Sequence, residues 1–440
     1  MLIPFIYWKE AKMKKIPFEH LDLTIYEETL EQGLQVYIVP KENCNNARAT
    51  LVTKYGSNVS EFVPMGKTEM IRVPDGVAHF LEHKLFEQED GVDPFSFFDE
   101  SGSECNASTN PWQTNYWFAG TQDFEKNLNF LLDFVQSPYF TKKNVEKEKG
   151  IIIQEIEMYM DNPYRVGFEK SNLNLLQVHP LRISTGGTKE SVESITEKDL
   201  YTCYETFYHP SNMALVITGN VDPEMTMEWI RKNQARKQFP KPEPIKIQEY
   251  QEPDTVNKEF ESIAMNVTIP KIFINYKLNK REMKDIPDTL LSLYVSIYLD
   301  IKLSATSSFL EQLKKDKVVT EDLYFDFSDI ESHILLSIEG ETERQDELIS
   351  RIDLELKNTK TIEADFIRKK KTILSSCIFM SDSVDRLNNR LVSDFVRYGH
   401  VRSNLYDEYQ SLNYSDFRKV VDAFHFEHRS VLVIHSKNTN

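Results

Sequence analysis

Three residues whose side chains could carry out catalysis lie close together in the apolar stretch GVAHFLEHKLFEQ, residues 76–88. On a helix, His79 and His83 are one turn apart on the same face, so their ring nitrogens can converge on one metal ion. Glu82 points off the ligand axis but lies close enough to contact water at that ion, as a general base must. The order HxxEH is a recognised inversion of the HExxH zinc helix. The alternative is a helix with incidental histidines, although buried imidazoles and carboxylates need partners.

A catalytic zinc ion needs a third protein ligand and an open fourth position. The segment NVEKEKGIIIQEIEMYM, residues 144–160, is predicted to be a helix and offers two glutamates. Glu148 and Glu155 share a helix face but lie about 10.5 Å apart along its axis, so they cannot both bind one ion. Glu155 has isoleucine neighbours, where a lone carboxylate is costly, whereas Glu148 stands between two lysines and can be solvated. We therefore expect Glu155 to be the ligand and Glu148 a supporting carboxylate, although either could be a surface glutamate.

The composition of the 440-residue chain is that of a globular protein, with 40% hydrophobic and 28% charged residues. A formal net charge of −17 argues against binding to the phosphate backbone of nucleic acid. The four cysteines are widely spaced and form no CxxC pair, which indicates free thiols in a reducing compartment. We find no membrane-length apolar run and no signal-peptide pattern. We therefore expect a cytoplasmic protein without a membrane or nucleic-acid partner.

The elements that must position these residues follow from periodicity and turn signals. In the first half, strands are predicted at 23–29, 34–40, 49–57, 113–120 and 213–220, and helices at 75–88, 124–137 and 144–160. A polar loop is expected between the first helix and the strand at 113–120. Strands and helices then recur in a similar order, from the strand at 271–278 to the strand at 430–436. This recurrence indicates two divergent copies of one α+β unit.

The predicted division of the chain follows a change of composition. A proline-rich, charged segment without periodicity, 236–255, is interpreted as a linker. The segment 13–235 is the expected zinc-bearing peptidase domain, and 256–440 is a second homologous domain that lacks the zinc motif. Residues 1–12 precede the patterned sequence and are interpreted as an N-terminal extension.

Several strings together resemble the pitrilysin-like metallopeptidases, which carry the inverted zinc motif. These strings are HFLEH, GSECNASTNPWQTNYWFAG, EKGIIIQEIEMYMDNP and FYHPSNMALVITGNVDPE. The best match is to the bacterial subfamily akin to the mitochondrial processing peptidase. The resemblance implies two tandem α/β sandwich domains of the LuxS and mitochondrial-processing-peptidase type, each with a mixed sheet covered by helices. It also implies a zinc-dependent endopeptidase that hydrolyses peptides, either in peptide turnover or in the maturation of a secreted peptide.

The resemblance also assigns roles to particular residues. One zinc ion per chain would be held by His79, His83 and Glu155, with Glu148 supporting them and Glu82 activating water. These assignments agree with those reached from spacing alone. One alternative is a non-catalytic scaffold subunit of a related complex, which loss of a zinc group would favour. Another is a shorter metal-dependent lyase with a cysteine ligand, but no cysteine here stands in such a context.

Substrate contacts are implied by the NAxT element of the same family, which borders the site while substrate lies extended along a sheet edge. Here that element begins with Asn106 and Ala107. Strand addition of this kind holds a peptide by its backbone, so sequence preference is loose. The alternative for Asn106 is a loop asparagine that makes a turn.

The sequence departs from the self-sufficient members of the family in its second half. Those members carry an arginine and a tyrosine, seven residues apart, that bind substrate and stabilise the oxyanion. Here Lys314 and Glu321 occupy these places, and Tyr324 comes three residues late. We therefore expect a zinc-bearing subunit of a heterodimer, whose zinc-less paralogous partner supplies the arginine and tyrosine.

Overall fold

The computed structural model describes residues 13–437, and the proposed extension 1–12 lies outside this range. The chain forms two compact units that interleave along the sequence. Unit 1 runs up to Ile152 and also contains Thr185–Gln248 and Ile378–Leu405. Unit 2 contains Ile153–Ser184, Glu249–Cys377 and the residues from Tyr406 onward. The chain passes from unit 1 to unit 2 after Gln248, and this point lies inside the predicted linker 236–255.

Unit 1 is built on a seven-stranded sheet in the order β1-β2-β3-β9-β4-β8-β7. Its strands are β1 (Lys14–Phe18), β2 (Leu23–Thr29), β3 (Gln35–Pro40), β4 (Ala47–Thr53), β7 (Glu104–Thr109), β8 (Thr114–Gly120) and β9 (Met213–Gly219). The β3–β9 pair is parallel and the other pairs are antiparallel. Among residues 13–437, β7 pairs with β8 alone, so β7 is an edge strand.

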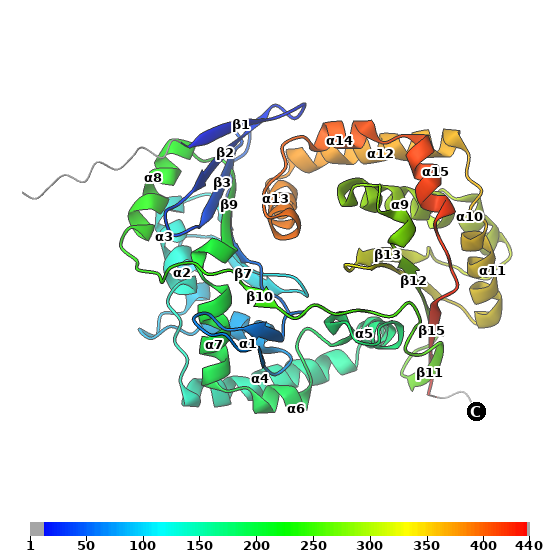
Figure 1. Cartoon of the computed structure of the whole chain (residues 1–440), viewed down its shortest axis with the longest axis horizontal. Coiled ribbons are helices and arrows are strands. Elements are labelled where there is room, and N and C mark those ends of the chain that lie inside the picture. Colours follow the sequence, from blue (N-terminus) through cyan, green and yellow to red (C-terminus); the bar gives the residue numbers. More distant parts are fainter. Residues whose placement is uncertain (1–12, 438–440) are drawn as a thin grey trace, which may run out of the picture. The chain divides into compact units, whose positions relative to one another are not determined.

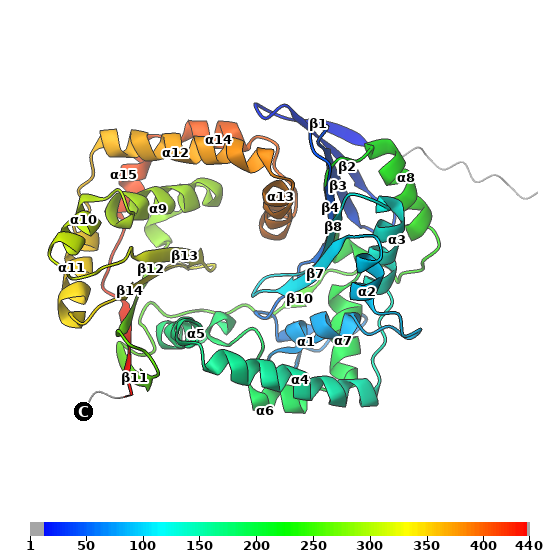
Figure 2. The same cartoon turned by 180° about the vertical axis from the view of Figure 1, so that it is seen from behind.

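Helices cover both faces of this sheet, and every residue of β4 and β9 is therefore buried. The covering helices are α3 (Phe124–Val135), α8 (Pro223–Gln234) and α13 (Val384–Tyr398). Figures 1 and 2 show α13 on the face opposite to α3 and α8. A buried asparagine fixes α13 on the sheet: the Asn388 amide donates to the Val216 carbonyl at 3.1 Å and accepts from the Thr50 hydroxyl at 2.6 Å.

Unit 1 contains further helices and short strands, and the last part of α4 belongs to unit 2. They are α1 (Val77–Leu85), α2 (Pro94–Asp99), α4 (Lys142–Met160), α6 (Lys189–Ser194), α7 (Glu197–Phe207), a 3-10 turn (Pro210–Asn212), and the strands β5 (Glu61–Val63), β6 (Ile71–Arg72) and β10 (Lys246–Ile247). The last three strands form a small sheet in the order β10-β5-β6. Since β10 falls within 236–255, part of the predicted linker belongs to a sheet.

Unit 2 contains a five-stranded mixed sheet in the order β11-β15-β12-β14-β13. Its strands are β11 (Phe260–Met265), β12 (Lys271–Asn279), β13 (Tyr324–Asp329), β14 (His333–Glu341) and β15 (Arg429–Ser436). The β11–β15 pair is parallel and the others are antiparallel. Its helical elements, assigned by most of their residues, are α5 (Pro163–Leu175), α9 (Asp288–Leu303), α10 (Ser308–Lys315), α11 (Gln345–Lys357), α12 (Glu363–Asp382), α14 (Leu405–Ser411), α15 (Tyr414–Asp422) and two 3-10 turns (Pro180–Arg182, Arg281–Met283).

The sheet of unit 2 is also covered on both faces. Its main core lies on one face, where Ile274 and Tyr276 of β12 join Tyr298 of α9. On the other face α5 packs against β12 and β15. A Cβ atom on Gly167 of α5 would lie 2.0 Å from the ring of Phe273, so only glycine allows this close approach.

A structural repeat supports the proposed duplication. In the first half the long helix α4 is followed by α5, which belongs to unit 2 and packs on its sheet. In the second half the long helix α12 is followed by α13, which belongs to unit 1 and packs on its sheet. Thus in each half a long helix is followed by a helix that packs on the sheet of the other unit. The predicted α+β class with mixed, helix-covered sheets is confirmed.

Most of the predicted elements are present with small shifts of their ends. The strand predicted at 23–29 is β2, and the helix predicted at 144–160 lies within α4. One expectation is wrong: the stretch expected to be a polar loop before 113–120 holds the helix α2 and the strand β7. Its alternating burial, exposed then half-buried along β7, is that of a strand whose polar face is open to solvent.

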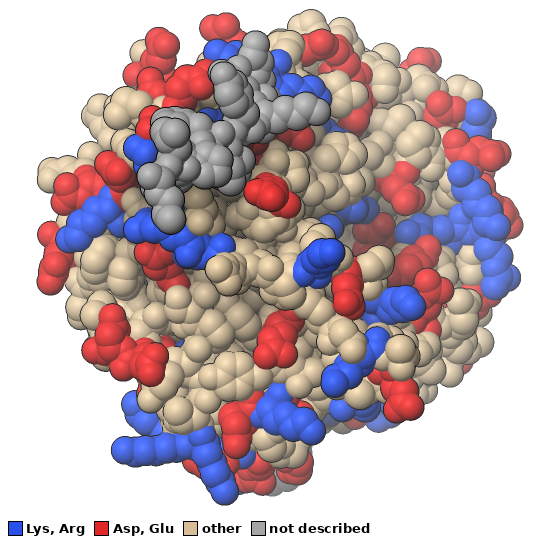
Figure 3. All heavy atoms as spheres, turned by 60° about the vertical axis from the view of Figure 1, so that its left-hand side comes forward, with Lys and Arg blue, Asp and Glu red and all other residues tan. Residues whose placement is uncertain are grey.

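None of the helices within 13–437 combines the length and the apolar character needed to cross a membrane. Figure 3 shows one face of the molecule, on which lysine and arginine side chains are interspersed with aspartate and glutamate.

Candidate metal centre

Helix α1 carries both histidines of the predicted site. Its apolar side is buried and contacts α7, β7 and β8. The buried apolar residues are Val77, Ala78, Phe80, Leu81 and Leu85. His79, Glu82 and His83 form the remaining stripe and are only half-buried. The two imidazole rings lie 4.6 Å apart between centroids, so the predicted i, i+4 pairing on one helix face is present.

Two glycines allow α1 to begin where it does. Gly76 precedes the helix with a φ of 92°, and a Cβ atom there would lie 2.5 Å from the carbonyl oxygen of Gly186. Gly187 has a φ of 77°, and its Cβ atom would lie 2.5 Å from the carbonyl oxygen of Asp75. A side chain at either glycine would force the two backbone segments apart. The Gly186–Gly187 pair therefore positions the start of the histidine helix.

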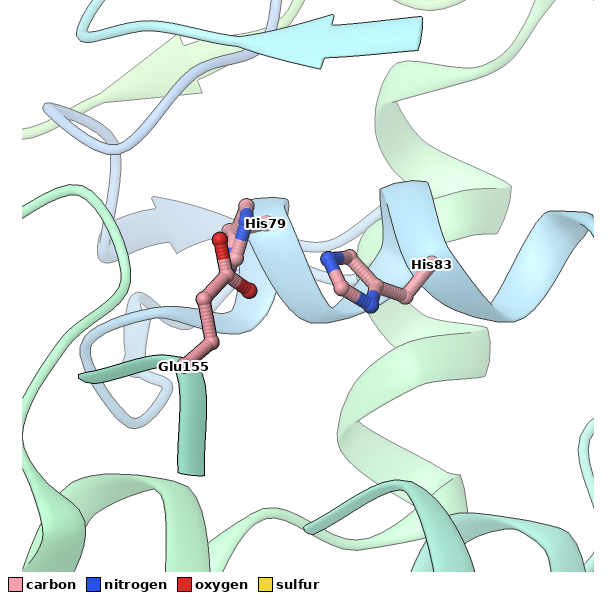
Figure 4. Close-up of side chains that lie close together, drawn as sticks. All are labelled: His79, His83 and Glu155. Carbon is pink, nitrogen blue, oxygen red and sulfur yellow. The ribbon is translucent and has the colours of Figure 1, made fainter. Parts of the chain in front are cut away.

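Glu155 comes from α4 and completes the group. The boundary between the units falls after Ile152, but α4 continues without a break to Met160, so Glu155 lies on its next turn. The ligand atoms of His79, His83 and Glu155 all lie within 4.8 Å of one another. Figure 4 shows the Glu155 carboxylate directed toward the two rings, which reach it from α1.

This set of donors fits a zinc ion. Two imidazole nitrogens and one carboxylate oxygen are the three protein ligands of one common type of catalytic zinc site. Ligand atoms placed about 2.0–2.2 Å from one tetrahedral ion stand about 3.4 Å apart. The three ligand atoms here lie within 4.8 Å of one another, so the group is of the size that one zinc ion requires.

Glu148 lies behind His83, on the same stripe of α4 as the buried Ile152. Its Oε1 lies 3.2 Å from His83 Nδ1, and its Oε2 lies 3.6 Å from Lys84 Nζ. Burial alone would raise the pKa of Glu148, but the hydrogen bond from His83 and the charge of Lys84 hold it below its usual value. A carboxylate in this position orients the imidazole and leaves its other nitrogen for a metal.

The surroundings expected from the sequence for Glu148 and Glu155 differ from those in the structure. Glu148 was expected to be solvated, yet its exposed fraction is 8%. The isoleucine environment expected for Glu155 is also incomplete, because Ile151 is 46% exposed and Glu155 itself is only half-buried. The neighbours in sequence point in other directions around the helix, so they do not describe the surroundings of either carboxylate.

Glu82 is held by a residue that sequence reasoning missed. The hydroxyl of Thr109, at the end of β7, donates to Glu82 Oε2 at 2.6 Å. Thr109 also lies 3.2 Å from the hydroxyl of Thr114, which donates to the Tyr55 carbonyl at 2.9 Å. Since the Thr114 hydrogen is used there, the Thr109 hydrogen is directed to Glu82. The only signal for Thr109 in the sequence is its place as the fourth residue of NAST.

Two buried tyrosines stand beside Glu82. The hydroxyls of Tyr116 and Tyr208 are 2.9 Å apart, and neither residue is more than 2% exposed. Burial, assisted by the nearby charge of Glu82, raises the pKa of both phenols. Both tyrosines therefore stay neutral, and they give Glu82 a partly apolar environment.

Asn106 and Ala107 lie on β7, opposite Trp117 and Tyr116 of β8. The side-chain oxygen of Asn106 accepts a hydrogen bond from the backbone N–H of Ala107 at 2.8 Å. This N–H therefore points to the open side of β7 rather than to β8. The expected loop or turn is replaced by an edge strand, whose far end carries Thr109 against Glu82.

Lys84 is the second residue that sequence reasoning missed. It follows His83 but belongs to the buried side of α1, with no exposed side-chain surface. The signal in the sequence is a lysine at the helical spacing of Phe80 and Leu81, where an apolar residue is expected.

Comparison with known proteins identifies the family to which the chain belongs. Residues 54–189 match the family model described as Insulinase (Peptidase family M16). Residues 194–373 match the model described as Peptidase M16 inactive domain. The chain belongs to peptidase family M16. Membership of this insulinase family confirms the predicted kinship with pitrilysin-like metallopeptidases, and the chain is a metallopeptidase.

Individual relatives agree with this family assignment. The chain is 41% identical over 406 residues to the uncharacterized zinc protease YmfH of Bacillus subtilis, covering 90% of this chain and 92% of that protein. It is 25% identical over 208 residues to the mitochondrial-processing peptidase subunit beta of Caenorhabditis elegans, covering 46% of this chain and 43% of that one. The crystal structure of an M16-like peptidase from Alicyclobacillus acidocaldarius superposes with a TM-score of 0.89 at 30% identity, covering 95% of this chain and 99% of that one. Zinc is thus the metal named for members of the family.

Proposed function

We propose that this chain is the zinc-bearing subunit of a heteromeric endopeptidase. In this proposal His79, His83 and Glu155 hold one zinc ion, Glu148 orients His83, and Glu82 is the general base. The observation that carries it is the meeting of two imidazoles and a carboxylate from distant parts of the sequence within 4.8 Å. A scaffold role would need none of these groups, whereas the whole set is in place.

When bound, zinc would supply a Lewis acid that polarises the peptide carbonyl and lowers the pKa of water. The protein groups then handle protons and orientation. Glu82 takes the proton of the attacking water and later gives it to the leaving amine. The hydrogen bond from Thr109 to Oε2 keeps the Glu82 carboxylate in one orientation. Glu148 keeps His83 turned with Nδ1 toward α4.

The proposed substrate is a peptide in extended form, added to the free edge of β7. The Ala107 N–H points to that edge, where the Asn106 side chain now accepts its hydrogen. A substrate carbonyl would take the place of that side-chain oxygen, and Asn106 would be released to contact the peptide backbone. Because Thr109 on the same strand contacts Glu82, a peptide bound in this register runs past the general base. Such binding suits both peptide turnover and maturation of a secreted peptide.

Threonine 109 gives a test of this arrangement. Thr109→Val removes the hydroxyl with little change of shape, and we expect kcat to fall about tenfold, because a hydrogen bond to a charged group is lost. KM is expected to stay within about twofold, since substrate binds the backbone of β7. Thr109→Ser keeps the hydroxyl and should restore most of kcat. Steady-state kinetics on an internally quenched peptide measures both constants, and equal kcat values for all three proteins would contradict the proposed role.

A paralogous partner is part of the proposal because the second half lacks the arginine and tyrosine pair. Lys314 of α10 is engaged by Asp322 at 2.5 Å, and Tyr324 is 60% exposed at the start of β13. The proposed partner is a zinc-less member of the same family that supplies these substrate-binding groups. The name of the related mitochondrial-processing peptidase subunit is consistent with pairing in the family.

We expect the purified chain to carry a full complement of zinc. Its peptide hydrolysis should be about 100-fold slower than that of the complex, because the loss of one oxyanion-stabilising group has an effect of this size. The chain is tagged, purified from its source cell at low salt, and the zinc content and peptide hydrolysis of complex and free chain are compared. Glu82→Gln assembled with the same partner is the control, and it should form the complex without activity. A free chain as active as the complex would rule out the need for a partner.

We also propose that the chain acts in the cytoplasm. Cys44, Cys105 and Cys203 are free thiols, which is the state that a reducing compartment maintains.

A further inference from the structure

Lys84 is the most unusual charged residue near the site. Its side chain has no exposed surface, although lysine is almost never fully buried without a partner. Placing an ammonium group in a protein interior costs several kcal/mol unless partners compensate it. The residue follows His83 directly but lies on the buried side of α1, whereas His83 is half-buried. Its burial therefore calls for an explanation beyond packing.

The ammonium group of Lys84 has two acidic partners. One is Glu87, which lies two residues beyond the end of α1 and makes a short ion pair with Lys84. The other is Glu148 of α4, whose Oε2 lies 3.6 Å from Nζ. Glu87 is 37% exposed at its side chain, whereas Glu148 is only 10% exposed. The buried charge of Lys84 thus has a buried counter-charge in Glu148.

Glu148 uses its two oxygens for two different neighbours. Oε2 faces Lys84, and Oε1 lies 3.2 Å from His83 Nδ1. Because a carboxylate can only accept, the imidazole donates its Nδ1 hydrogen. The carboxylate is therefore held at both ends, and its plane is defined by Lys84 on one side and His83 on the other. Without Lys84, one of its oxygens would lose its cationic neighbour.

We propose that Lys84 is a positioning residue for the metal centre, which acts by holding Glu148 in the orientation that turns His83 toward the zinc ion. This inference rests on the proposed function, in which His83 is a ligand. Partners that orient a metal-binding histidine contribute about 10–100-fold to metal affinity. Lys84 does not contact the metal-binding histidine in this scheme but contacts Glu148, so its effect on zinc must pass through Glu148.

A simple charge effect would have the opposite sign. A cation close to a zinc ion repels it, so removal of the Lys84 charge would tighten zinc binding if proximity were all that mattered. A positioning role requires that removal weakens zinc binding. The direction of the change therefore separates the two explanations.

The experiment measures zinc affinity of the full chain by competition with a chromophoric chelator. The variants are K84M, E148Q and K84M/E148Q, with K147M as the control that removes an exposed lysine charge beside Glu148. We expect K84M to bind zinc about tenfold more weakly than the wild type. We expect no further loss when K84M is added to E148Q, and no change for K147M. Methionine matches the length of the buried lysine stem and suits the apolar surroundings.

A second comparison separates the two acidic partners. E87Q removes the more exposed partner of Lys84 and leaves Glu148 in place, so we expect zinc affinity to stay within about twofold of the wild type. If E87Q weakens zinc as strongly as K84M, Lys84 acts through the structure of α1 and the proposal is overturned. Unchanged or tighter zinc binding by K84M also overturns it.

The role of Lys84 can be tested even if the single variant K84M does not fold. If K84M does not fold, K84M/E148Q carries no lone buried charge, and its comparison with E148Q alone decides the question. Equal zinc affinities of these two proteins support the action of Lys84 through Glu148, and weaker binding by the double variant overturns it. If instead the wild-type chain binds no zinc, or H79A binds it as well as the wild type, the proposed function itself fails.

Discussion

Glu82→Gln will keep zinc bound and lower peptide hydrolysis by about 1,000-fold, within the range contributed by general acid–base catalysis. The amide has nearly the shape of the carboxylate and can still accept the hydrogen bond from Thr109, which lies 2.6 Å from Glu82 Oε2. It cannot take a proton from water. Steady-state hydrolysis of a quenched peptide by the assembled enzyme, together with zinc analysis of the same sample, measures both effects.

The matched control is Glu89→Gln, which makes the same chemical change at an exposed position shortly after α1. It should leave both hydrolysis and zinc content unchanged. Turnover close to that of the wild type in a zinc-replete Glu82→Gln protein would show that another group removes the proton, and the assignment of Glu82 as general base would have to be abandoned.

Glu155→Gln is expected to weaken zinc binding by more than about 100-fold, above the range typical of carboxylates that only orient a ligand. Two imidazoles would remain, and a neutral amide oxygen is a poor replacement for the charged ligand. Peptide hydrolysis should fall with the zinc content and return partly at high zinc concentration. Competition with a chelator gives the affinity, and added zinc in the activity assay gives the rescue.

Glu157→Gln is the natural control, because Glu157 lies two residues further along α4 and is exposed. Glu148→Gln is the informative comparison, since it should weaken zinc less than Glu155→Gln does. If Glu148→Gln abolished zinc binding while Glu155→Gln retained it, the roles of the two glutamates would be reversed.

The histidine pair could be predicted from the sequence because it depends on local geometry alone. His79 and His83 are one helical turn apart, and any helix formed by 76–88 places them on one face. The apolar residues between them predict which face is buried. The structure confirms this arrangement with α1 and its half-buried polar stripe.

The burial of the two glutamates could not be predicted in the same way. Sequence neighbours suggested that Glu148 is solvated between lysines and that Glu155 sits among isoleucines. On α4 these neighbours point away from the two carboxylates, and the surroundings of Glu148 come instead from α1, through His83 and Lys84. Burial on a helix depends on the elements packed against each face, and adjacent residues carry little information about them.

The strand β7 shows the same limit for the substrate edge. Its polar residues indicated a loop, because an edge strand buries little and lacks a continuous apolar pattern. Only pairing with β8 makes it a strand, and only that pairing places Thr109 beside Glu82. The exchange of α5 and α13 between the units likewise leaves no local signal in the sequence.

The sequence by itself determined the chemistry that is available: a helix with two imidazoles and a carboxylate at spacings set by its 3.6-residue turn, and a second helix with two candidate glutamates. The sequence also favoured Glu155 over Glu148 as the ligand, but the tertiary structure alone decided that Glu148 is buried against His83 and Lys84 and that Thr109 holds Glu82. The physical reason is that helix periodicity is a property of neighbouring residues, whereas convergence of α1, α4 and β7 depends on packing between segments that are far apart in the chain.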